Sequence, residues 1–111
     1  MILIEQKEAY IYVSSNDASF GDFLMNFEEE HAVIAEKHII ISISESFKAT
    51  EKDILSFLNY AEIHQKNGTT FVVVCTNVEV DSFPEAFNIV PTLQEAEDVL
   101  EMENIQRDLG F

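Results

Sequence analysis

The sequence predicts an α/β fold with a mixed, mostly parallel sheet of four or five strands and about three to four helices. Short β-branched runs alternate with amphipathic segments along most of the chain. Such alternation implies right-handed crossover connections, which join parallel strands. The first two strands are the exception, because only the dipeptide "KE" separates them, and this favours an antiparallel pair. At 111 residues, the chain is expected to form one domain, 1–111.

The first half of the chain supplies three strands and one helix. Strands are expected at 1–6 and 9–14, which are rich in Ile, Tyr and Val. The polar residues 15–17 are candidate caps for a helix, and the apolar residues after them recur at helical spacing: Phe20, Phe23, Leu24 and Phe27. The run "HIIISIS", 38–44, is then predicted to be a strand well inside the sheet.

A second helix is expected from Thr50 to about Lys66. Its buried stripe would consist of Ile54, Phe57, Leu58 and Ala61, and Asn67-Gly68 would end it. The next run, "TTFVVVC", is apolar on both faces, which is typical of a parallel strand covered by helices.

The last part of the chain begins with an irregular connection, because Pro84 disfavours a long regular element there. A short strand, "NIV", comes next. The final helix is predicted to start at a capping box, with Thr92 as the cap and Glu95 three residues later. Residues 101–111 would extend this helix as a tail until Gly110 ends it.

Charge is the extreme feature of the composition. The chain has 21 Asp and Glu residues against 6 Lys and Arg, a formal net charge of −15. Such a surface repels phosphate backbones and anionic lipid head groups, so the sequence disfavours nucleic-acid and membrane-surface binding. A charged partner is therefore expected to be basic.

The chain contains a single cysteine, Cys75, which excludes an internal disulfide and is consistent with a reducing compartment. The N-terminal segment "MILIEQKEA" lacks the basic start and long apolar core of a secretory signal. No apolar run approaches the ~20 residues of a membrane-spanning helix. We therefore expect the protein to be cytoplasmic.

The order of elements, the helix opening "ATEKDILSFL" and the closing "NIVPTLQEAEDVL" together resemble the STAS family, which includes anti-sigma-factor antagonists. The resemblance spans nearly the whole chain. It implies a sheet backed by helices on one side and a protein-binding switch. In that family, a kinase phosphorylates a serine in an Asp-Ser-Ser-Gly-like motif at the start of the second helix.

Matching the buried positions of that helix to the family puts Thr50 at the aspartate, Glu51 at the phosphorylated serine and Asp53 at the glycine. The resemblance therefore implies a lost phosphoserine motif. Thr50 and Asp53 also fit an ordinary capping box, and an acidic Glu51 suits a helix N-terminus. Two alternatives remain open: Glu51 as a fixed mimic of the phosphorylated state, or a one-residue slip that puts Thr50 itself at the phosphosite.

The chain is also similar to short proteins that carry the label ribonuclease Z and have a similar tail, here "RDLGF". That nuclease needs a His-x-His-x-Asp-His cluster for two zinc ions, and the three histidines His31, His38 and His64 lack this spacing. We expect structural or surface roles for them. The sequence predicts no catalytic residue, metal site or cofactor.

The favoured hypothesis is a non-enzymatic regulatory module that binds a protein, either an anti-sigma-type kinase or a protein with a basic surface. The expected contact surface is the second-helix start and the loop 76–84, with the tail 101–111 as a further candidate. Its candidate contacts are Thr50, Glu51, Asp53, Asp81, Ser82 and Phe83. For the last three, the alternative is a structural role, with Asp81 and Ser82 shaping the loop and Phe83 acting as a hydrophobic plug. The alternative is a small enzyme or ligand carrier with an acidic pocket near the same edge. Self-association as a homodimer is a third hypothesis, because the tail residues Met102, Ile105, Leu109 and Phe111 could form an exposed patch.

Overall fold

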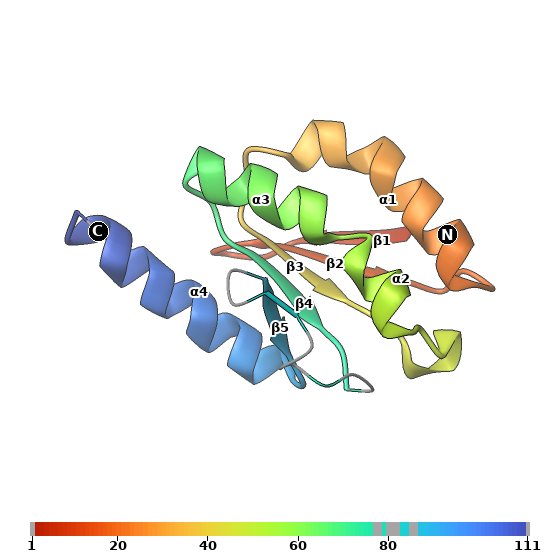
Figure 1. The fold of residues 1–111 in the computed structure, drawn as a ribbon. Helices are drawn as coiled ribbons and strands as arrows, with labels where there is room; N and C mark the ends of the chain where they lie inside the picture. Colours follow the sequence, from red (N-terminus) through yellow and green to blue (C-terminus); the bar gives the residue numbers. More distant parts are fainter. Residues whose placement is uncertain (1, 77–78, 80–82, 85–86, 111) are drawn as a thin grey trace.

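A computed structural model describes residues 2–76, 79, 83–84 and 87–110. It confirms the predicted α/β fold with a mixed sheet (Figure 1). The described strands follow the order β1-β2-β3-β4-β5 and comprise β1 (Ile2–Gln6), β2 (Ile11–Ser15), β3 (Ile39–Ser42), β4 (Phe71–Val74) and β5 (Asn88–Val90). β1 and β2 are antiparallel, whereas each later strand pairs in parallel with its neighbour.

The helices cover both faces of the sheet. α1 (Phe20–Ile34), α2 (Glu51–Leu55) and α3 (Leu58–Asn67) lie on one face, whereas α4 (Leu93–Asp108) lies across the other (Figure 1). The expectation of helices on one side, which came from the STAS resemblance, is therefore wrong for α4. The reason is the strand sequence itself: β4 is apolar on both faces, and each face needs a cover.

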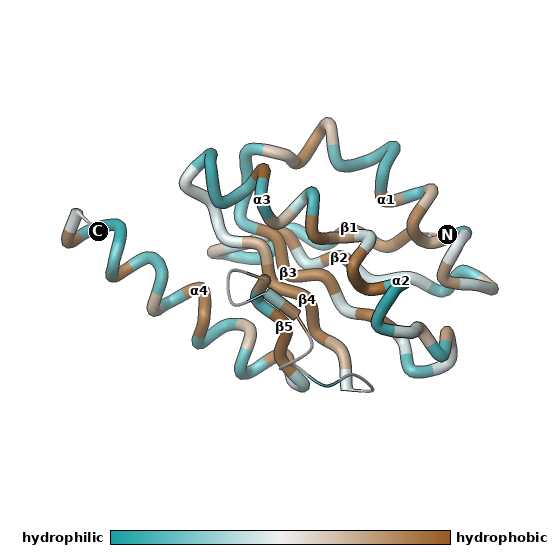
Figure 2. Tube along the Cα trace, viewed as in Figure 1, coloured by the Kyte–Doolittle hydropathy of each residue, from teal (hydrophilic) through white to brown (hydrophobic). Residues whose placement is uncertain are grey.

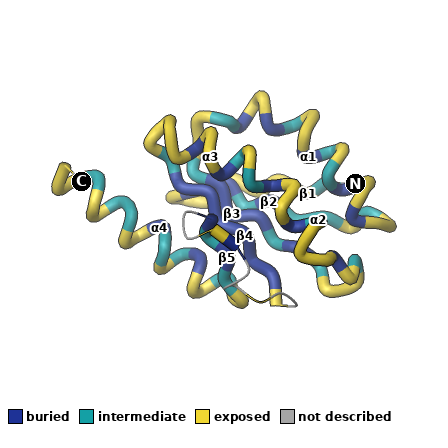
Figure 3. Tube along the Cα trace, viewed as in Figure 1, coloured by how far each residue is buried: buried dark blue, intermediate teal, exposed yellow. Residues whose placement is uncertain are grey.

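Two apolar clusters fill the space between these layers. The larger one lies under α1, α2 and α3 and includes Phe23, Phe27 and Phe57, all fully buried. The smaller one lies under α4 and joins Ile40 and Val72 of the sheet to Leu100. Alternate residues of the central strands β3 and β4 pack into one cluster or the other. These two strands are therefore buried on both faces, as the dark blue stretches of Figure 3 show.

The helix boundaries differ from the sequence predictions in two places. Ser19, rather than a residue of 15–17, caps α1 by accepting a hydrogen bond from the backbone N–H of Asp22. The helix predicted over 50–66 is two helices. The backbone N–H groups of Ser56 and Phe57 bond to carbonyls three residues back, and this tighter turn separates α2 from α3.

Other details of the prediction stand with shorter bounds. The strand predicted over 38–44 is confirmed only for 39–42. Gly68 ends α3 in the left-handed conformation, with φ of 77°, as the sequence predicted. Thr92 caps α4 by accepting a bond from the backbone N–H of Glu95.

Cys75 directly follows β4 and is buried. Its backbone N–H bonds to the carbonyl of Val90, which extends the pairing of β4 with β5. Among the helices of the described ranges, none combines the length and apolarity needed to cross a membrane.

Candidate functional sites at the two edges of the sheet

The first candidate site lies at the carboxyl edge of the sheet, where β3 ends. The chain passes there through a short 3-10 helix, η1 (Glu45–Phe47), into α2. Lys48 between them has φ of 50°, in the left-handed region that non-glycine residues seldom adopt. This turn sets the direction in which α2 leaves the sheet.

The predicted capping box at the start of α2 is confirmed. Thr50 Oγ1 accepts a bond of 3.2 Å from the backbone N–H of Asp53, and the Asp53 carboxylate accepts one of 3.0 Å from the backbone N–H of Thr50. Glu51 is the first residue of α2 and is exposed. Thr50 and Asp53 thus satisfy backbone donors of the helix start, and the side chain of Glu51 faces solvent.

The segment after β4 reaches the same edge. Thr76 Oγ1 donates a hydrogen bond of 2.7 Å to Glu45 Oε1, which ties this segment to η1. Phe83 is buried and packs edge-on against Phe87. Phe83 is therefore a core side chain, contrary to its prediction as a partner contact, whereas the candidates Asp81 and Ser82 lie outside the described residues.

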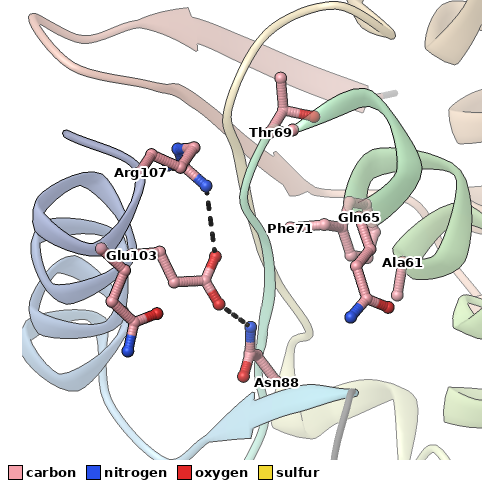
Figure 4. A pocket seen from close by; sticks show the side chains of 9 residues that line it. Ala61, Gln65, Thr69, Phe71, Asn88, Glu103 and Arg107 are labelled. Atoms are coloured by element: carbon pink, nitrogen blue, oxygen red, sulfur yellow. Dashed lines mark hydrogen bonds and ion pairs between the residues drawn. The ribbon is translucent and has the colours of Figure 1, made fainter. Parts of the chain in front are cut away.

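The second candidate site lies at the opposite, amino edge, where β4 extends beyond β5. A pocket of about 270 Å³ opens there between α3 and α4 (Figure 4). Ala61 and Phe71 form its apolar part, and its polar lining comes from Gln65, Gly68, Thr69, Asn88, Glu103, Gln106 and Arg107.

Glu103 is the centre of the polar side of this pocket. Its Oε1 accepts a bond of 2.7 Å from the Thr70 hydroxyl, and its Oε2 accepts one of 3.0 Å from the Asn88 amide. Arg107 Nη2 donates to Thr70 Oγ1 at 2.9 Å, and its Nη1 lies 3.8 Å from Glu103 Oε1. This network joins α4 to β4 and β5, and it offers both a carboxylate and a guanidinium to a polar ligand.

His38 lies beside this network. Its Nδ1 accepts a hydrogen bond of 3.0 Å from the backbone N–H of Thr70, so the neutral ring carries its proton on Nε2. Burial lowers the pKa of His38, the nearby Arg107 lowers it further, and Glu103 opposes both effects. A largely neutral imidazole therefore supports the start of β4.

The other two histidines form a buried pair between α1 and α3. The Nε2 atoms of His31 and His64 are 2.9 Å apart. The Thr69 hydroxyl donates to the carbonyl of His64 and accepts from His64 Nδ1–H at 2.7 Å, so His64 Nε2 must accept the proton of His31 Nε2. Burial lowers the pKa of both rings, and for His64 it falls to about 4.

The sequence predicted structural or surface roles for the histidines, and the burial of His31 and His64 agrees with the structural role. It did not predict that they pair, nor that Glu103 is half-buried. The signal for Glu103 was present: Ala96, Leu100, Glu103 and Arg107 follow one another at three- and four-residue steps on the side of α4 that faces the sheet.

The described residues contain no group of three or more His, Cys, Asp and Glu side chains arranged to hold a metal ion. The sequence matches no protein-family model and has no significant match among curated proteins.

Proposed function

We propose that this protein is a cytoplasmic, non-enzymatic regulatory module that binds a protein partner through the carboxyl edge of its sheet. The resemblance to anti-sigma-factor antagonists makes an anti-sigma-type kinase, or another protein with a basic surface, the partner of choice. The net charge of −15 favours a partner with a basic surface, and it disfavours nucleic acids and anionic membranes as partners.

One observation carries the proposal: two segments far apart in the sequence meet at this edge. The hydrogen bond between Thr76 and Glu45 joins the segment after β4 to the turn that leads into α2. Loops that follow the strands of a rigid sheet often carry the binding residues of a protein. The described strands run in the sequential order β1-β2-β3-β4-β5, so the support here comes from these loops and not from a crevice where the strand order reverses. The exposed Thr50 and Glu51 stand at this edge.

The capping box favours constitutive binding over a phosphorylation switch. Glu51, at the position that matches the family's serine, has no hydroxyl to phosphorylate. The Thr50 hydroxyl already caps α2, so its phosphorylation would require the box to open. The proposed module therefore has a fixed negative charge where the family has a switched one.

Affinity capture with matched charge reversals tests this proposal. The wild type, Glu51→Lys and the control Glu62→Lys, which changes an exposed residue of α3 by the same charge, serve as baits for quantitative mass spectrometry. We expect one protein to be retained by the wild type and the control and to be at least about tenfold depleted with Glu51→Lys. Equal recovery of every captured protein on all three baits would refute the role of this edge.

The polar pocket at the amino edge favours a second candidate function, a small-ligand carrier or enzyme. Its volume of about 270 Å³ and its lining of amide, carboxylate and guanidinium groups suit a small polar molecule. Thermal unfolding in the presence of nucleotides or divalent metal ions separates the two functions, because a bound ligand raises the apparent stability by mass action. A clear stabilisation would favour the carrier.

A further inference from the structure

The outward side of α4 is unusual for a helix that packs on a sheet. Its inward side buries Ala96 and Leu100. In its second half, the opposite side carries three large apolar residues, Met102, Ile105 and Leu109, which are 53%, 53% and 67% exposed. This half of α4 extends beyond the edge of the sheet, and apolar positions alternate with polar ones along it (Figures 1 and 2).

The apolar stripe continues into a groove. Ile105 also lines a cavity of about 370 Å³ between α4 and the turn that joins β1 to β2. Ala9, Tyr10 and Leu100 supply the rest of its apolar lining. Ile105 therefore connects the exposed stripe to a concave surface large enough for one or two apolar side chains.

Carboxylates line the same groove. Glu97, Glu101 and Asp108 lie along its α4 side, and none of them is within ion-pair distance of a described basic group; the Lys7 ammonium of the β1–β2 turn attracts Glu97 from farther away. Glu97 Oε2 accepts a bond of 2.8 Å from the Tyr10 hydroxyl, which fixes one wall. The described basic side chain of α4, Arg107, instead belongs to the polar pocket and lies against Glu103 and Thr70.

We propose that this groove and stripe bind a basic amphipathic segment of a partner protein. The apolar side chains of that segment would enter the groove beside Ile105 and cover Met102 and Leu109, and its Lys or Arg side chains would face Glu97, Glu101 and Asp108. Charge complementarity selects this occupant, because a second copy of this chain would bring like charges together at a net charge of −15 per copy.

This surface is separate from the carboxyl edge, because the second half of α4 and the β1–β2 turn both lie at the amino edge. The two proposals can therefore fail independently. A module with both surfaces could hold two proteins at once.

The experiment uses a fluorescent peptide of Leu and Lys at helical spacing as the probe. A peptide with Glu in place of Lys and a peptide of scrambled order serve as ligand controls. Fluorescence anisotropy would measure affinity at two salt concentrations, and NMR chemical-shift mapping on the full chain would locate the contact. We expect saturable binding of the Leu/Lys peptide, weakened by salt, with shifts concentrated on α4 and the β1–β2 turn.

Matched variants decide whether the groove is responsible. Ile105→Glu and Glu101→Lys should each weaken binding about tenfold or more. Their controls, Val33→Glu at an apolar residue of α1 that is 79% exposed and Glu62→Lys on α3, should change it less than about twofold. Circular dichroism confirms that each variant is folded.

Several outcomes would overturn the proposal. These are no binding of the Leu/Lys peptide, equal binding of the acidic or scrambled peptide, or equal weakening by the control variants. Concentration-dependent dimerisation in analytical ultracentrifugation that Ile105→Glu abolishes would assign the surface to a second copy instead.

Discussion

Acidification should destabilise this protein through the buried His31–His64 pair. Burial lowers the pKa of His64 from 6.5 to about 4. At a pH between these two values, His64 is therefore protonated in the unfolded chain and neutral in the folded one. The stability from this residue is present above pH 6.5 and is lost as the pH falls toward 4. The loss amounts to about 2 kcal/mol between pH 7.5 and pH 5, and approaches ~3 kcal/mol below pH 4.

The loss of stability from His64 on acidification can be told apart from the general effect of pH, because the two have opposite signs. With a net charge of −15, partial protonation of carboxylates relieves repulsion and works in the opposite direction. Urea unfolding followed by circular dichroism at pH 7.5, 6 and 5 gives the free energy of unfolding at each pH. Between pH 7.5 and pH 5, the free energy of unfolding of the wild type should fall by about 2 kcal/mol more than that of a reference variant without the pair.

The reference variant is His31→Phe combined with His64→Leu, which replaces both rings by apolar groups of similar size. The double change avoids leaving one buried nitrogen without its partner. If the wild type and the double variant show the same dependence on pH, the buried pair is not the cause and the reasoning is wrong.

Three further predictions concern stability, each measured by urea unfolding at pH 7.5. Thr50→Ala should lower the free energy of unfolding by about 1 kcal/mol because it removes the cap of α2, whereas Thr50→Ser, which keeps the hydroxyl, should lower it much less. An Ala variant as stable as the wild type would contradict the role of the box. Glu103→Ala should lower the free energy of unfolding by about 1–3 kcal/mol because it leaves the hydroxyl of the buried Thr70 without its acceptor, and Glu103→Gln should lower it less. Phe27→Ala should cost about 3–5 kcal/mol, since Phe27 is fully buried against Phe57 and Phe71; a loss below 1 kcal/mol would indicate that the core collapses around the gap.

The strand and helix order followed from the sequence because periodicity and β-branched runs act locally. The clearest example is "TTFVVVC", whose two apolar faces indicated the cover on both sides that α4 and the other helices provide. The family resemblance, with helices on one side, was less accurate than the strand pattern at this point.

Features that depend on tertiary contacts were not predicted. The turn that separates α2 from α3 carries no glycine or proline, and it brings Phe57 into the core between α1 and β4. The His31–His64 pair joins residues 33 positions apart. Nothing in the local pattern of either histidine specifies its partner.

The candidate site was predicted in part. The Thr50–Asp53 box follows from spacing alone, and its bonds are present. Phe83 was assigned to a binding surface although it is buried, because an aromatic residue in an irregular connection gives no indication of the side to which it points. The network around Glu103 was not predicted, although the position of Glu103 in line with Ala96, Leu100 and Arg107 indicated it.

Cys75 gives the protein a natural reporter of local opening. The lone thiol is buried at the end of β4, beside the segment that carries the bond from Thr76 to Glu45. Because the thiol is buried, a small alkylating reagent reaches it when the structure around it opens, so the labelling rate measures how often this end of the molecule opens. A partner seated on the carboxyl edge would slow the labelling, whereas one in the α4 groove would leave it unchanged.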